Sequence, residues 1–157
     1  MFKSNASTFA KSLKDVSPRW NRKVATRIIN AARFVHQSLI DKTPVWEGQT
    51  VRNYIMTLDV GYSGKIDPIG EGATGQTSKM GLGDEPRRAE NASAALETGS
   101  ILTLDNAFSR ILITNNSDNV AGLELGQLPD SGRSRSPNGM FAITLEELLS
   151  RLNSKTI

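Results

Sequence analysis

The chain has 157 residues, a mass of 17.1 kDa and a mean hydropathy of −0.33, values that fit a single globular domain. It has no cysteine, which excludes disulfides, thiol nucleophiles and zinc–thiolate sites, and its single histidine, His36, leaves little scope for a histidine metal site or a serine triad. We find no apolar run of about 20 residues and no apolar signal-peptide core, so we expect a cytosolic chain, or one assembled there, with no membrane partner.

The net charge of +3 is unevenly distributed along the chain. Residues 1–46 carry nine Lys and Arg against two Asp, a net +7, whereas residues 47–157 carry ten basic against fourteen acidic residues, a net −4. Such asymmetry is typical of nucleic-acid binding, or of a basic face on one subunit that meets an acidic face on the next. Trp20 is the only aromatic residue between Arg19 and Arg33, fewer than a single-strand platform requires, so the subunit interpretation is favoured.

Helical periodicity dominates the N-terminal third. We predict a helical arm over residues 1–16 and then a long helix that begins at Ser17-Pro18, a cap-and-proline start signal, and ends before Pro44. Three basic residues at a spacing of four lie beside its apolar stripe, and these are Arg19, Lys23 and Arg27. The stripe itself is formed by Trp20, Val24, Ile28, Ala31, Val35 and Leu39.

The middle of the chain alternates regular patterns with a long glycine-rich stretch. Apolar alternation predicts a strand over Val51–Val60. Gly61–Gly83 then holds seven of the thirteen glycines, and a loop of this length inside one domain is usually functional or disordered. Asp84 is a suitable cap for a helix from Glu85 to about Thr98, with Gly99 directly after its end.

The C-terminal third predicts short strands, a polar loop over residues 127–139 and a terminal helix. Thr144 and Glu147 match a capping box, which predicts that this helix begins at Thr144 and has an apolar face of four leucines, Leu145, Leu148, Leu149 and Leu152. The strands are expected at Ser100–Leu104, Phe108–Thr114 and Met140–Ile143, with a short apolar piece at Val120–Leu125.

Only one strand–helix–strand unit is present, which favours an α+β fold: an antiparallel sheet packed by the long N-terminal helix and shorter helices, with long extended loops. The residues predicted to form its core are Val24, Ile28, Val35, Tyr54, Met56, Leu58, Ile111, Ile113 and Leu148.

Two candidate ligand sites are weak when their context is considered. Gly70, Gly72 and Gly75 match the G-x-G-x-x-G pattern, but Pro68 precedes them and no helix is predicted to start there, so nucleotide binding is not favoured. A Ser-Arg repeat over residues 131–136, with Arg133 and Arg135, has groups that bind phosphate, but it is more typical of a segment that orders against a protein partner.

Candidate catalytic residues are equally few. His36 lies on the long helix, where a lone histidine is more typical of a surface or interface residue than of a catalyst. Glu146 and Glu147 diverge by about 100° on a helix and are interpreted as a capping box and a solvated face. We therefore expect no enzymatic activity, no cofactor and no metal.

Four short motifs follow one another along nearly the whole chain. They are Phe9-Ala10-x-x-Leu13; Thr43-Pro44-Val45 with Gly48 and Arg52; Ile111–Asn116 with Ala121–Gly126; and Ser136–Met140 with Thr144–Glu147. In this order they resemble the "FA-x-x-L", "TPV-x-x-G-x-x-R", "TNN…LEYG" and "APAGM…T-x-x-E" motifs of the phage minor-tail family, whose members act as tail-completion or neck proteins at the head–tail junction.

This resemblance implies a non-enzymatic structural protein of a tailed bacteriophage virion, assembled in the host cytoplasm. Its expected role is a homo-oligomeric ring or collar at the neck that completes the tail and joins it to the head, next to other neck, tail-terminator or connector proteins. A small basic nucleic-acid-binding module is the alternative, and genomic DNA in the ring lumen is an additional candidate partner. The residues predicted to contact neighbouring subunits are Arg19, Lys23, Arg27, Gly70, Gly72, Gly75, Arg133 and Arg135.

Overall fold

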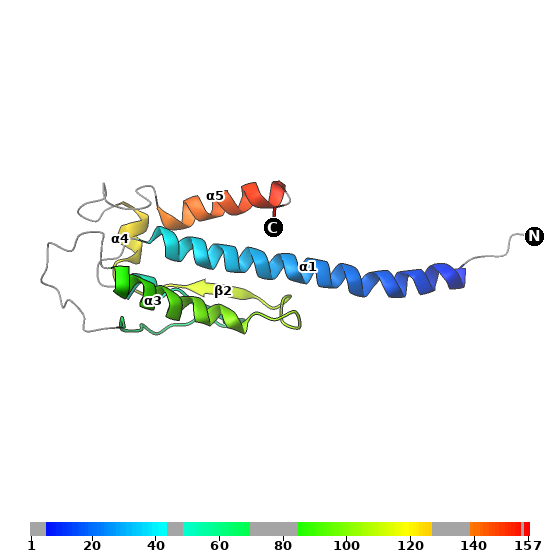
Figure 1. Cartoon of the computed structure of the whole chain (residues 1–157), viewed down its shortest axis with the longest axis horizontal. Helices are drawn as coiled ribbons and strands as arrows, with labels where there is room; N and C mark the ends of the chain where they lie inside the picture. Colours follow the sequence, from blue (N-terminus) through cyan, green and yellow to red (C-terminus); the bar gives the residue numbers. More distant parts are fainter. Residues whose placement is uncertain (1–5, 44–48, 70–84, 127–138, 155) are drawn as a thin grey trace, which may run out of the picture.

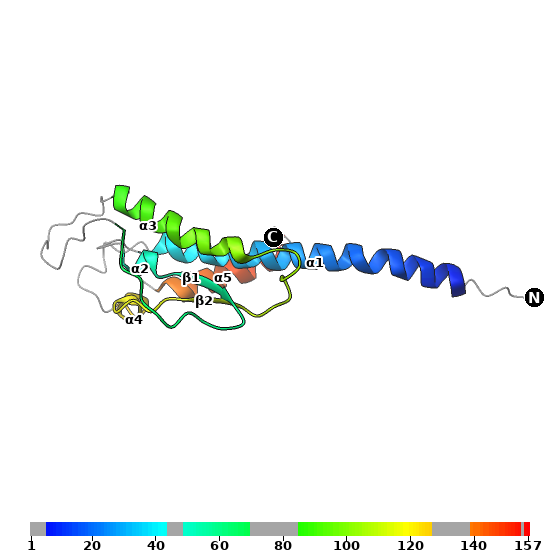
Figure 2. The same ribbon diagram turned by 90° about the horizontal axis from the view of Figure 1, so that it is seen from below.

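A central helix, α1, runs the length of the molecule, with α5 along one side and α3 and a two-stranded sheet on the other (Figure 1). In the view from below, α3 and the sheet lie on different sides of α1 (Figure 2).

The computed structural model describes residues 6–43, 49–69, 85–126, 139–154 and 156–157. Its elements are α1 (Ala6–Lys42), α2 (Gln49–Arg52), β1 (Ile55–Leu58), α3 (Glu85–Glu97), the 3-10 helix η1 (Thr98–Ile101), β2 (Ile111–Thr114), α4 (Val120–Glu124) and α5 (Met140–Asn153). The predicted α+β class is confirmed.

The helix α1 is continuous through Pro18, so the predicted boundary at Ser17-Pro18 is wrong. A proline inside a helix removes one backbone hydrogen bond and crowds the preceding turn. That cost is smallest on a stretch of helix that no other element packs against, and the residues from Val16 to Val24 are exposed. The Ser-Pro pair, which usually marks the start of a helix, lies here in the interior of α1. The N-terminal part of α1 extends beyond the rest of the fold (Figure 1).

The buried face of α1 is offset by about one residue from the predicted stripe. Ala25 and Ile29 are buried, whereas Val24 is exposed and Ile28 is half-buried. One residue corresponds to about 100° around a helix, so the predicted stripe points beside the core. The true row continues through His36 and Thr43, two polar residues that a hydropathy pattern does not include.

The sheet consists of β1 and β2, which pair antiparallel with Ile55 opposite Thr114 and Leu58 opposite Ile111. Both strands are shorter than predicted, because the residues before Ile55 form α2 and those before Ile111 form turns. Two other predicted strands are not strands: Ser100–Leu104 begins in the last two residues of η1 and continues as irregular structure, and Met140–Ile143 is the first turn of α5.

Two apolar clusters form the core. One joins α1 to α2, α3 and α5, and the other joins α1 to the sheet and the residues after η1. Of the predicted core residues, Tyr54 and Met56 are buried; Ile28, Val35, Leu58, Ile111, Ile113 and Leu148 are half-buried; and Val24 is exposed. The first cluster consists of Leu39, Ile40, Val51, Tyr54, Ala95 and Met140, and the second of Ala25, Ile29, Met56, Leu102 and Ala107.

The first part of the predicted glycine-rich loop, residues 61–69, is held by three asparagine side chains. The Asn53 amide bonds to both the carbonyl and the N–H of Ile66, at 2.7 and 2.8 Å. Asn91 does the same at Ile69, and Asn116 donates to the carbonyls of Tyr62 and Gly64. This segment is therefore part of the folded body, while residues 70–83 of the predicted loop lie outside the described residues.

Candidate assembly surfaces

Beyond the apolar packing of Met140, polar and charged side chains make the contact between α1 and α5. The Glu147 carboxylate lies 2.7 Å from the Lys42 ammonium and 3.1 Å from the Ser38 hydroxyl. The Arg151 guanidinium lies over the Phe34 ring, 4.2 Å from its centroid. The hydrogen bond from Lys42, with smaller electrostatic contributions, lowers the pKa of Glu147. The predicted capping role of Glu147 is wrong, since this side chain holds α5 against α1 instead.

Three of the four leucines of α5 face outward, away from this contact, and the fourth, Leu148, is half-buried. Leu145 is 56% exposed and Leu149 is 52% exposed, and Phe141 and Leu152 extend the same row. Thr144, by contrast, is buried and donates to Ser38. Besides the buried Met140, the helix therefore turns Thr144 and Glu147 to its own domain and an apolar face to the outside. We call Phe141, Leu145, Leu149 and Leu152 the leucine face.

The N-terminal part of α1 presents a second uncovered apolar row. Trp20 is 62% exposed, and Val16 and Val24 are exposed on the same side of the helix. We call these three residues the projecting row, because this part of α1 extends past the other labelled elements (Figure 1). Lys23 lies 5.9 Å from the Trp20 ring centroid, so a positive charge accompanies the aromatic surface.

The predicted basic row lies on the same stretch of helix. Arg19, Lys23 and Arg27 are all exposed, which leaves them accessible to a partner. Arg27 also donates a 3.0 Å hydrogen bond to the carbonyl of Ile157. The other predicted contact residues, Gly70, Gly72, Gly75, Arg133 and Arg135, lie outside the described residues, so their assignment stays a prediction.

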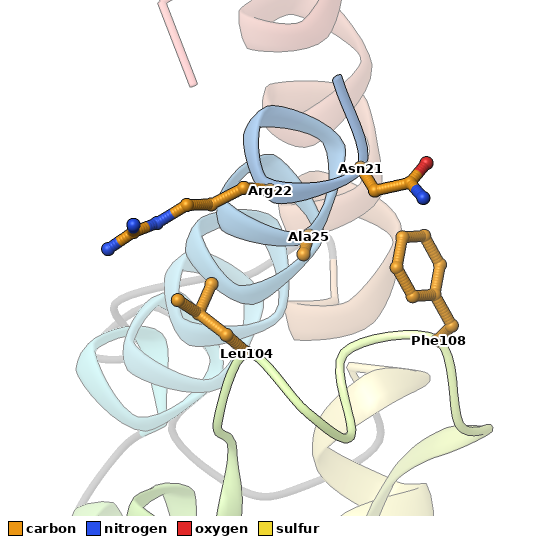
Figure 3. Close-up of a pocket in the computed structure, with 5 residues that line it drawn as sticks. All are labelled: Asn21, Arg22, Ala25, Leu104 and Phe108. Atoms are coloured by element: carbon orange, nitrogen blue, oxygen red, sulfur yellow. The ribbon is translucent and has the colours of Figure 1, made fainter. Parts of the chain in front are cut away.

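A groove of about 410 Å³ opens at the base of the projecting part of α1. Its floor is Ala25, with Leu104 and Phe108 on either side (Figure 3). Asn21 and Arg22 complete the lining. The groove is shallow and has no acid–base pair, so it suits an apolar side chain of a partner better than a substrate.

His36 is not a surface residue as predicted, since it is only 1% exposed. Its Nε2 lies 2.9 Å from the carbonyl of Tyr54, which can only accept, so the neutral ring donates from Nε2. Burial lowers the pKa of His36, an effect that the hydrogen bond to Tyr54 opposes. This histidine joins α1 to the start of β1 and is structural.

The motif residues near the chain's C-terminal end also have structural roles. Glu124 accepts hydrogen bonds from the first N–H groups of α5, and Gly139 precedes them with φ of +94°, where a side chain would strain the backbone. Asn115 donates to the carbonyl of Thr50 and thereby ties the end of β2 to α2. In the fold, these motif residues therefore cap α5 and join β2 to α2.

Comparison with protein-family models, curated proteins and solved structures finds no match to this chain. Within the described residues, no group of three His, Asp or Glu side chains is arranged to hold a metal ion. In the same part of the chain, no helix has both the length and the apolar character needed to cross a membrane. The candidate functional surfaces are the uncovered apolar faces on α1 and α5.

Proposed function

We propose that this chain is a structural protein of a tailed-phage virion that forms a ring or collar at the neck, where it completes the tail and joins it to the head. The observation that carries the assembly role is the orientation of α5. Its Glu147 and Arg151 face its own domain, while Leu145 and Leu149 face outward. Exposed apolar surface of this kind costs free energy unless a partner covers it.

The location at the neck is supported by the resemblance of the four sequence motifs to the tail-completion family. The proposed partners are further copies of this chain and the adjacent neck, tail-terminator or connector proteins of the virion. The role is non-enzymatic and needs no cofactor, and assembly takes place in the host cytoplasm.

The test is a phage genome that encodes this chain, with its start codon removed. We expect filled heads and free tails that fail to join, and joining restored when purified chain is added to the lysate. Density for the chain at the neck of the mature particle would establish its position. Normal infectious particles without the chain would overturn the proposal.

A basic nucleic-acid-binding module is the second candidate, favoured by one observation. Between Val16 and Arg27 the helix carries four basic side chains and no acidic one, and all four are exposed. Phosphate contacts by such a row would make duplex affinity fall steeply with salt. The charge-reversal experiment in the Discussion separates the two functions.

A further inference from the structure

The helix α1 carries two equivalent rows on one face, and only one of them is covered. Phe34, Ser38 and Lys42 are the residues that hold α5. Each member of the projecting row, Val16, Trp20 and Val24, lies 18 residues earlier, in the same order. Eighteen residues are five turns of an α-helix, so the two rows share a face and lie about 27 Å apart.

The chain's own α5 cannot cover the projecting row. It runs antiparallel along α1, with Met140 near Thr43 and Arg151 over Phe34. The chain then ends its described course at Ile157, bonded to Arg27, one turn short of Lys23. Among the described residues, no element lies on the continuation of this face, which leaves the projecting row open to a second molecule.

The leucine face has the spacing that the projecting row requires. Phe141, Leu145 and Leu149 are each four residues apart, as are Val16, Trp20 and Val24. Ridges formed by residues four apart interdigitate in the commonest class of helix packing in globular proteins. Both rows are apolar and exposed in a single copy.

We propose that the leucine face of one copy packs on the projecting row of a second copy. Each α5 would then lie between two α1 helices, its own on the polar side and its neighbour's on the apolar side. The two surfaces differ, so the contact is head-to-tail and propagates until it closes into a ring or extends as a filament. This deepens the proposed function, on which it rests for the assembly role, by naming the surfaces that join the copies.

Charge favours this pairing over two symmetrical ones. Two projecting stretches packed together would set four basic side chains of one copy against four of the other, which is repulsive. Two leucine faces packed together would leave Trp20 exposed and bring both Glu146 carboxylates to one seam. In the head-to-tail contact, Glu146 borders the leucine face and meets a basic stretch; within the described residues it forms no ion pair of its own.

The test uses two substitutions in the full chain, Trp20→Asp and Leu149→Asp, with sedimentation velocity as the measurement. The wild-type chain should self-associate, and each variant should be monomeric, because a buried unpaired carboxylate weakens the contact by at least about tenfold. Both residues are more than half exposed, so circular dichroism should show an unchanged fold.

An equimolar mixture of the two variants gives the decisive result. Trp20→Asp keeps its leucine face and Leu149→Asp keeps its projecting row, so together they should form a one-to-one dimer. The dimer should grow no further, because its two remaining faces are the damaged ones. Thr26→Asp on α1 and Ser150→Asp on α5 are the matched controls, since both residues are exposed and lie off the two rows, and both variants should associate as the wild type does.

Two outcomes would overturn the contact. If Trp20→Asp associates normally while Leu149→Asp is monomeric, α5 pairs with itself. If the wild type is monomeric at every concentration, the partner is not a second copy. The proposed function fails separately: a chain that shows the predicted dimer but is absent from virions refutes the neck role and leaves the contact standing.

Discussion

The carboxylate of Glu124 accepts a 2.6 Å hydrogen bond from the backbone N–H of Met140, sixteen residues later in the chain. The same side chain accepts from Phe141 at 2.9 Å and from Ala142 at 3.2 Å. One side chain at the end of α4 thus satisfies three of the four N–H groups that a helix start leaves unpaired, and its charge opposes the positive end of the helix dipole. This contact sets where α5 begins.

We expect Glu124→Ala to lower the free energy of unfolding by about 1–2 kcal/mol, the usual cost of losing a helix cap. Denaturant unfolding measures the loss, and hydrogen exchange should quicken first at Met140, Phe141 and Ala142. Ser150→Ala is the control, because Ser150 is exposed on the same helix, off the leucine face, and its loss should change stability by less than about 0.5 kcal/mol. Equal effects of the two substitutions would show that the cap does not stabilise α5.

The start of α5 shows why part of the fold was not predictable from sequence. Thr144 and Glu147 match a capping box, and such rules consider only neighbouring residues. The actual cap comes from another helix, and Thr144 and Glu147 serve the contact with α1 instead. The α+β class and the bounds of α3 depend on local patterns, and these were predictable, whereas the pairing of β1 with β2 joins distant segments and was not predicted.

The buried face of α1 predicts that alanine substitution at two adjacent isoleucines lowers the free energy of unfolding by different amounts. Ile29→Ala should cost about 2–4 kcal/mol, as is usual for truncating a buried isoleucine, because Ile29 packs in the cluster between α1 and the sheet. Ile28→Ala should cost clearly less, because Ile28 is only half-buried. Denaturant midpoints of the two variants measure the difference, and the reverse order would place the core on the face that hydropathy alone predicts.

The residues that were wrongly predicted to be buried on α1 include two members of the projecting row. Trp20 and Val24 are apolar residues at helical spacing, so a hydropathy pattern assigns them to the core of a monomer. In the structure they are exposed, while the polar His36 is buried. A covered row and an uncovered row have the same pattern in a sequence, and only the packing of the sheet and of the residues after η1 against Ala25 and Ile29 distinguishes them here.

Burial of neutral His36 predicts that stability falls in mild acid. Its pKa is lowered from the ordinary 6.5 in the folded chain, so below pH 6.5 the unfolded chain binds a proton that the folded chain does not. The free energy of unfolding should therefore decrease as pH falls below 6.5, by at most about 1.4 kcal/mol per pH unit from this group. Thermal unfolding of wild type and His36→Gln between pH 7.5 and about 5 checks this, since the variant lacks the histidine's share of the slope.

The two hydrogen bonds between the Asn53 amide and the backbone of Ile66, here called the Asn53 clamp, should stabilise residues 61–69. Asn53→Asp keeps the shape but replaces the donor to the Ile66 carbonyl with a charged acceptor, so we expect a loss of about 1–3 kcal/mol. The Ile66 amide should then exchange faster with solvent. Asn119→Asp is the control, since Asn119 is exposed in the turn before α4. Unchanged exchange at Ile66 would show that the clamp does not hold the segment.

Reversal of the basic row separates subunit contact from DNA binding. We expect the triple substitution Arg19→Glu, Lys23→Glu and Arg27→Glu to abolish self-association and entry into particles, because a basic stretch is the partner of the acidic border of the leucine face. All three residues are exposed, so the domain should stay folded by circular dichroism. The wild-type chain should show no measurable duplex affinity at physiological salt.

The nucleic-acid alternative predicts the opposite pattern. Neutralisation of three phosphates gives a slope near −3 when the logarithm of duplex affinity is plotted against the logarithm of salt concentration. That slope should vanish in the triple variant while self-association persists, because on this alternative the three basic side chains contact phosphates and not a neighbouring copy. A fluorescence titration of labelled duplex at several salt concentrations, run beside sedimentation of the same samples, measures both properties. A steep slope with intact assembly would identify α1 as a phosphate-binding helix, since a helix packed on a neighbour's α5 could not lose three charges and remain assembled.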